Sequence, residues 1–128
     1  MDLLLDTHTL LWFINGDEML PAKAKTSIQN INNKCYVSIA SIWEIAIKLS
    51  LNKLDLNIKF DDISSIMVQN DFELLPISFE HIQRLLKLDF HHKDPFDRII
   101  IAQGIEDKLK IVTKDKEFSK YKVTILWE

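Results

Sequence analysis

The sequence is poor in residue types that mark several classes of protein. It has one cysteine, Cys35, so no disulfide can form within the chain, and this usage fits a reducing cytoplasm. The two glycines, Gly16 and Gly104, form no glycine-rich phosphate loop, and no serine-hydrolase elbow is present. No apolar run approaches the roughly 18 residues of a membrane span, and Met1–Asp6 lacks the basic start of a signal peptide. We therefore expect a soluble, cytoplasmic protein without a membrane partner.

A strongly basic charge balance is also absent. The 16 lysines and arginines stand against 19 aspartates and glutamates, which gives a net charge of -3. A polyanionic partner must then be held by a local patch or through a bound metal. The late lysines are the candidate patch, although a solvated face explains them equally well: Lys108, Lys110, Lys114, Lys116, Lys120 and Lys122. No histidine spacing indicates zinc, and His92 could contact substrate or simply contribute loop polarity.

The length and the apolar pattern predict one α/β domain covering residues 1–128. Hydrophobic residues make up 47% of the 128 positions, enough for a sizeable core, and no linker or repeat is visible. Short apolar runs alternate with helical patterns, which favours crossover connections and a parallel sheet. The expected strands are 2–6, 35–38, 73–76, 110–113 and 123–126. The expected helices are 8–15, 21–32, 39–51, 59–70, 78–88, 95–107 and 115–119.

Four acidic residues follow these strands or begin the helices beside them: Asp6, Glu44, Asp97 and Asp115. Because the carboxyl ends of parallel strands meet at one edge of a sheet, we expect the four carboxylates to converge there. Taken singly, Asp6 and Asp115 are equally well explained as helix caps. Taken together, the four carboxylates must either have raised pKa values or hold a divalent cation, and an all-oxygen site favours Mg2+ or Mn2+.

The helix positions of these acids leave several roles open. Glu44 could form a capping box with Ser41, an ion pair with Lys48, or a metal contact that leaves Lys48 free for a substrate phosphate. Asp94 precedes a proline and is predicted to be a helix N-cap, which places Asp97 in the first turn. There the helix dipole should lower the pKa of Asp97. We therefore favour Asp97 over Asp94 as a metal ligand.

Four segments together carry a family resemblance, in order and spread over nearly the whole chain: Leu4–Trp12, Val37–Lys48, His92–Arg98 and Val112–Asp115. With these segments the chain resembles the PIN-domain ribonucleases, particularly the VapC-type toxins of bacterial toxin–antitoxin pairs. The resemblance implies a three-layer α/β/α fold around a parallel sheet and a Mg2+- or Mn2+-dependent endoribonuclease that hydrolyses RNA phosphodiester bonds. It also implies inhibition by a cognate antitoxin. The family's acidic positions fall on Asp6, Glu44, Asp97 and Asp115.

The site roles follow from that chemistry, in which a metal-activated water needs no protein nucleophile. We expect Asp6 and Asp97 to be the nearest metal ligands. Glu44 and Asp115 would hold a second ion, a water or the general base, and Asp94 is the weaker ligand candidate. Three basic residues could engage substrate phosphate, with surface ion pairs as the equal alternative: Lys48, Arg98 and Lys114.

Two other functions and one partner surface are also compatible with the sequence. The chain could be a catalytically idle PIN-like binding module or a regulatory domain that is phosphorylated on an aspartate. The helices 39–51 and 59–70 are expected to form a protruding hairpin with a groove for an antitoxin segment. Its apolar positions, some of which core packing explains equally well, are Trp43, Ile47, Leu51, Ile63, Ile66 and Met67. The sequence leaves open whether the chain forms a homodimer.

Overall fold

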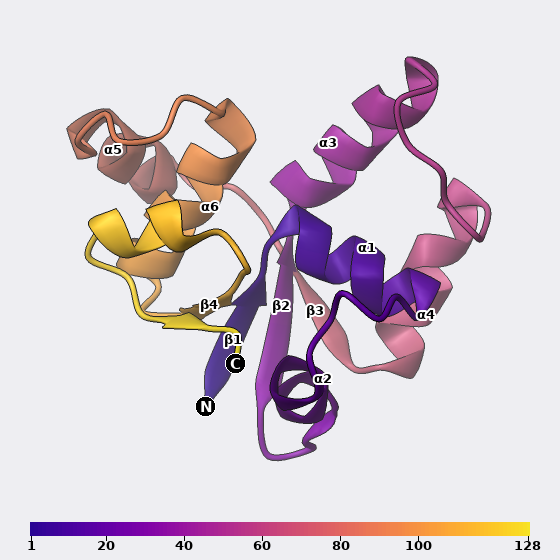
Figure 1. Cartoon of the computed structure of the whole chain (residues 1–128). Helices are drawn as coiled ribbons and strands as arrows, with labels where there is room; N and C mark the ends of the chain where they lie inside the picture. Colours follow the sequence, from indigo (N-terminus) through magenta and orange to yellow (C-terminus); the bar gives the residue numbers. More distant parts are fainter.

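A central parallel sheet lies between two layers of helices in the computed structural model, which describes residues 1–128 (Figure 1). The five strands run in the order β3-β2-β1-β4-β5, and every neighbouring pair is parallel. The α/β/α arrangement expected from the sequence is confirmed. The strands are β1 (Asp2–Leu5), β2 (Lys34–Ser38), β3 (Phe72–Leu75), β4 (Lys110–Val112) and β5 (Ile125–Leu126).

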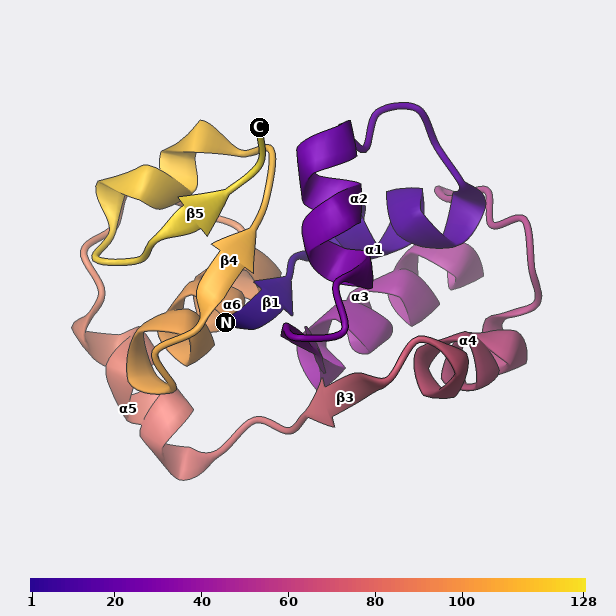
Figure 2. The ribbon, with the colours of Figure 1, turned by 90° about the horizontal axis from the view of Figure 1, so that it is seen from below.

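The helices cover both faces of this sheet (Figure 2). They are α1 (Thr7–Asn15), α2 (Ala22–Gln29), α3 (Ile39–Ser50), α4 (Ile63–Gln69), α5 (Phe79–Lys87) and α6 (Pro95–Glu106), with short 3-10 turns η1 (Phe60–Asp62) and η2 (Lys116–Lys120). Helices α1, α2 and α4 pack on one face, and α6 and η2 pack on the other. Helix α3 contacts both α1 and α6, so it connects the two layers at the carboxyl end of β2.

Alternation along β1 produces the two layers of core. Leu3 and Leu5 pack into the cluster formed with α1, α2 and α4, while Leu4 packs into the cluster formed with α6 and η2. All three side chains are fully buried. Successive side chains of a strand point to opposite faces, and a strand covered on both faces is apolar throughout. This is why the run Leu3–Leu5 has no polar residue.

Two expected helices are shorter than the sequence pattern indicated. The predicted helix 21–32 ends at Gln29, because the side chain of Asn30 accepts a hydrogen bond from the backbone N–H of Asn32 at 2.9 Å and turns the chain. The predicted helix 59–70 is split into the 3-10 turn η1 and the seven-residue α4. None of the helices has the length and apolar character that crossing a membrane requires.

The strand order places a switch point between β1 and β4. The chain builds β1, β2 and β3 in one direction across the sheet and then returns to add β4 on the other side of β1. In open parallel sheets the crevice beyond the carboxyl ends of the strands at such a point is the usual ligand site. In Figure 1, α1, α3 and the segment leading to η2 all leave the sheet at this end.

Candidate functional site

Asp6 lies directly beyond β1 and is almost completely buried, with 5% of its surface exposed. Its Oδ1 accepts a hydrogen bond from the backbone N–H of Thr9 at 2.9 Å, so the residue caps α1. Its Oδ2 accepts from the hydroxyl of Thr113 at 2.5 Å. Burial raises the pKa of Asp6, and the hydrogen bonds from Thr113 and Thr9 oppose that shift. Asp6 can therefore cap α1 and still contribute its carboxylate to a buried site.

Thr113 lies at the candidate site, although the sequence did not single it out. It follows β4 and is fully buried, and its Oγ1 also accepts the backbone N–H of Asp115 at 3.0 Å. On the neighbouring helix, the hydroxyl of Thr9 donates to the carbonyl of Val112 at 2.8 Å. These bonds fix Asp6 against the end of β4. The sequence signal that could have identified Thr113 is a hydroxyl residue at the carboxyl end of a buried apolar run, two residues before an acid.

Glu44 projects from α3 and is also buried, with 5% exposed. The expected ion pair is present, with Lys48 Nζ at 2.9 Å from Glu44 Oε2. The capping-box alternative is wrong, because α3 begins after Ser38, whose side chain supplies the cap, and Ser41 lies inside the helix and accepts the hydroxyl of Thr7 at 3.0 Å. Glu44 Oε1 is buried without any hydrogen-bond partner. An orphaned buried carboxylate oxygen is costly, and a cation is one partner that would satisfy it.

Asp94 and Asp97 have the helix positions predicted for them. Asp94 Oδ1 accepts the backbone N–H groups of Phe96 at 2.9 Å and Asp97 at 3.0 Å, so its role as the α6 cap is confirmed. The expected lowering of the Asp97 pKa is wrong. Burial first, then the charge of Asp94, with smaller contributions from Asp6 and Glu44, raise the pKa of Asp97 to about 7. Desolvation and like charges thus outweigh the helix dipole.

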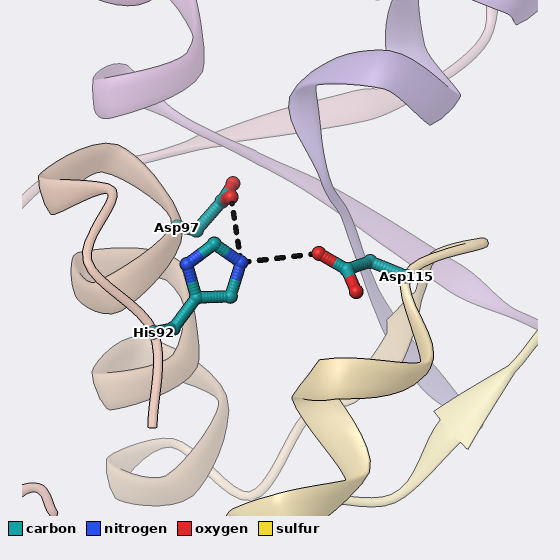
Figure 3. Close-up of side chains that lie close together, drawn as sticks. All are labelled: His92, Asp97 and Asp115. Carbon is teal, nitrogen blue, oxygen red and sulfur yellow. Dashed lines mark hydrogen bonds and ion pairs between the residues drawn. The ribbon is translucent and has the colours of Figure 1, made fainter. Parts of the chain in front are cut away.

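A histidine joins the third and fourth acids (Figure 3). His92 Nε2 lies 3.2 Å from Asp97 Oδ2 and 3.1 Å from Asp115 Oδ2. The three ligand atoms are all within 4.8 Å of one another. Asp115 also caps η2 through the backbone N–H of Glu117 at 2.9 Å, as the sequence indicated. No clear role for His92 could be predicted from the sequence, because only the fold brings its loop to these carboxylates.

Arg98 occupies a different position from the one expected. Its guanidinium is buried and donates to the carbonyls of Asp89 at 3.0 Å, His92 at 3.4 Å and Leu85 at 3.4 Å. The same group contacts the hydroxyl of Tyr121, which accepts the backbone N–H of His92 at 2.8 Å. Arg98 therefore fixes the loop that carries His92. This placement does not favour the contact with substrate phosphate predicted from the sequence.

The other two predicted phosphate contacts remain at the surface. Lys48 pairs with Glu44 and keeps 35% of its side chain exposed. Lys114 is exposed between Thr113 and Asp115, with its Nζ 6.0 Å from the centre of the Trp12 ring.

The arrangement as a whole suits a divalent cation. The charges of Asp6, Glu44 and Asp94 all act on Asp97, and His92 links Asp97 to Asp115. The acids predicted from the sequence thus gather at the switch point between β1 and β4. Repelling carboxylates, a buried oxygen without a partner and oxygen-rich donors are the features that a hard cation stabilises.

Comparisons with known proteins agree with the fold. The family model described as PIN domain matches residues 3–123. The chain is similar to VapBC2 from Rickettsia felis bound to a DNA fragment from their promoter, with 16% identity, a TM-score of 0.75 and 100% of both chains covered. It is similar to DNA-bound VapBC from Salmonella typhimurium, with 16% identity, a TM-score of 0.67, and 98% of this chain and 97% of that chain covered. FitAcB from Neisseria gonorrhoeae gives 16% identity, a TM-score of 0.66, and 97% and 96% coverage. No curated protein matches the chain in sequence.

Proposed function

The chain belongs to the PIN-domain family, and from that premise we propose that it is a metal-dependent endoribonuclease and the toxin of a toxin–antitoxin pair. The observation that carries the proposal is the convergence of Asp6, Glu44 and Asp97 at the switch point, with Asp115 joined to them through His92. The substrate is RNA and the reaction is hydrolysis of a phosphodiester bond. The similarity to the solved VapBC structures supports the fold on which this proposal rests.

In this proposal, the acidic side chains bind the cation and Thr113 orients one of them. Asp6 and Asp97 hold the cation, and Thr113 fixes the orientation of Asp6 through its hydroxyl. Glu44 and Asp115 complete the acidic lining, either as further ligands or as the groups that orient the attacking water. When bound, Mg2+ or Mn2+ lowers the pKa of a coordinated water and stabilises charge on the phosphoryl oxygens.

The two alternative functions predict different behaviour in one experiment. A catalytically idle module or an aspartate-phosphorylated regulator would leave RNA intact. We expect the purified protein, freed of any partner, to cut RNA with Mg2+ or Mn2+ and to stop in EDTA. Asp6→Asn should lose cleavage, whereas Asp2→Asn, an exposed aspartate at the opposite end of the same strand, should keep it. Undiminished cleavage in EDTA, or in Asp6→Asn, would overturn the proposal.

A groove beside α3 is the proposed binding surface for the antitoxin. It has a volume of about 300 Å3 and includes the apolar side chains of Ile39, Ile42, Phe60, Ile63, Met67 and Leu74. Two of the positions predicted for the groove, Ile63 and Met67, also belong to the core, while Trp43 and Leu51 are exposed. The predicted hairpin does not stand free, because the segment between α3 and α4 is attached to the end of α1, where Asn57 N–H donates to Asn15 Oδ1 at 3.2 Å.

We propose that an apolar antitoxin segment occupies this groove and directs a basic side chain toward the carboxylates. Expression of the chain alone should slow growth, and co-expression of the adjacent small open reading frame should restore it. Leu74→Glu should remain toxic but lose rescue, because Leu74 lies in the groove and away from the acids. Equal growth with wild-type and Asp6→Asn protein, at matched soluble levels, would remove the toxin interpretation.

The outer face of α5 supports a homodimer. Four large apolar residues are exposed along it and just beyond it: Phe79 (74%), Ile82 (47%), Leu86 (87%) and Phe90 (72%). These four residues are spaced nearly symmetrically about the midpoint of the segment 79–90. If two copies packed antiparallel along this segment, Ile82 would contact the partner's Leu86, and Phe79 would contact the partner's Phe90. A two-fold interface requires this self-complementarity.

The mass of the protein in solution tests the dimer. We expect light scattering to give twice the chain mass, and Leu86→Glu to give a monomer. Val68→Glu is the matched control, because Val68 is 76% exposed on α4. A monomeric wild-type protein at micromolar concentration would remove the homodimer from the proposal.

A further inference from the structure

His92 occupies a position that matches one corner of a metal coordination shell. Its Nε2 is 3.2 Å from Asp97 Oδ2 and 3.1 Å from Asp115 Oδ2 (Figure 3). Octahedral bonds of about 2.0–2.1 Å place adjacent ligand atoms about 2.9 Å apart. Tetrahedral bonds of about 2.0–2.1 Å place them about 3.4 Å apart. The two nitrogen–oxygen separations lie between these values, and the two carboxylate oxygens lie within 4.8 Å of each other, so the three atoms could share one cation.

The protein holds His92 in this position through its backbone and its ring. Its N–H donates to Tyr121 at 2.8 Å, and its carbonyl accepts from Arg98 at 3.4 Å. The ring meets the ring of Phe118 edge-on, with centroids 5.8 Å apart and planes at 85°. Residues that bind metals are commonly fixed by such supporting contacts. Independently, Glu44, whose charge also acts on Asp97, has a buried Oε1 without a hydrogen-bond partner, and a cation beside Asp97 would offset its charge.

We propose that His92 is a nitrogen ligand of a cation shared with Asp97 and Asp115, and that the centre therefore prefers Mn2+ to Mg2+. Imidazole suits transition metals, whereas Mg2+ takes oxygen ligands almost exclusively. To bind a cation through Nε2, the neutral ring would carry its proton on Nδ1 and would give up the hydrogen bond that Nδ1 accepts from the backbone N–H of Asp94 at 3.4 Å. That contact is long, so its loss costs little. The inference rests on the proposed function only in requiring a cation at this site.

The experiment measures metal binding directly, without RNA, on the metal-stripped full chain. Pulsed electron paramagnetic resonance of bound Mn2+ detects nitrogen nuclei in its coordination shell. We expect a nitrogen signal in the wild-type protein and in His91→Gln, and no such signal in His92→Gln. His91 is the matched control, because it is the adjacent histidine and its ring makes no contact with Asp97 or Asp115.

Calorimetric titrations give the second readout. His92→Gln should bind Mn2+ about tenfold or more weakly while its affinity for Mg2+ changes less, so the preference for Mn2+ falls. His92→Glu keeps a ligand atom but exchanges nitrogen for oxygen, and it should bind Mg2+ nearly as well as Mn2+. Circular dichroism melts of each variant verify that the fold is intact.

Two results would overturn the inference. One is a nitrogen signal that persists in His92→Gln, and the other is an unchanged ratio of Mn2+ to Mg2+ affinity in both His92 variants. Either would assign His92 the role of a hydrogen-bonding residue that only holds the loop. The same experiments separate failure of this inference from failure of the proposed function. A protein that binds Mn2+ through His92 but leaves RNA intact would refute only the proposed nuclease activity.

Discussion

Replacement of Asp97 by asparagine should stabilise the metal-free protein, and more so at high pH. The pKa of Asp97 is raised from 3.8 to about 7, chiefly by burial and by the charge of Asp94. In the unfolded chain the carboxyl ionises near its ordinary value, so the folded state holds the proton more tightly. The stability associated with the protonated form is fully present below about pH 4 and is lost as pH rises toward 7. The full shift corresponds to about 4 kcal/mol.

Asparagine keeps the shape and an acceptor oxygen for His92 but carries no charge. In the presence of chelator, the gain in unfolding free energy of Asp97→Asn over wild type should be about 1–3 kcal/mol larger at pH 8 than at pH 5. Denaturant titrations at the two pH values measure it. Glu80→Gln is the control, because Glu80 also lies in the first turn of a helix but is exposed. A gain independent of pH, or a loss of stability at pH 8, would refute the reasoning.

Three further predictions concern single side chains. Asp6→Asn should abolish RNA cleavage while the thermal melt stays at or above that of wild type, because one of several repelling carboxylates is removed; a variant that is inactive only because it unfolds would contradict this. Asp94→Ala should lose about 0.5–2 kcal/mol of stability with its cap, whereas Asp94→Asn keeps the cap and should cleave far better than Asp97→Asn; equal inactivity of the two asparagine variants would make Asp94 a ligand. Tyr121→Phe should cost about 1 kcal/mol and speed amide exchange at His91 and His92, because both N–H groups donate to its hydroxyl; unchanged exchange at both amides would show that the loop is held by other contacts.

The elements of the fold were predictable because their signals are local. The apolar run Leu3–Leu5 predicts a strand covered on both faces, and Asp94 before Pro95 predicts the start of a helix. The two helices whose lengths were predicted wrongly also depend on local features. The extent of α2 depended on a single asparagine turn at Asn30, and the region before α4 adopted one 3-10 turn instead of a continuous helix.

The convergence of acids at the candidate site was predictable from the sequence, but its geometry was not. Strand order brings the carboxyl ends together, so the convergence of the acids could be expected from the alternation of strands and helices. The direction of the Asp97 pKa shift could not, because it depends on how deeply the side chain is buried and which charges face it. Likewise, nothing in the sequence shows that the long side chain of Arg98 turns inward to the loop carrying His92.

The hydrogen bond between Thr113 and Asp6 joins residues 107 positions apart in the sequence. Asp6 is synthesised 107 residues before Thr113, which directly follows β4. Long-range pairings of this kind form late, because the intervening chain must be closed into a loop first. During synthesis the chain therefore carries its acidic residues without an assembled centre. The acidic centre proposed for catalysis is therefore assembled only after Thr113 has been synthesised and β4 has joined the sheet.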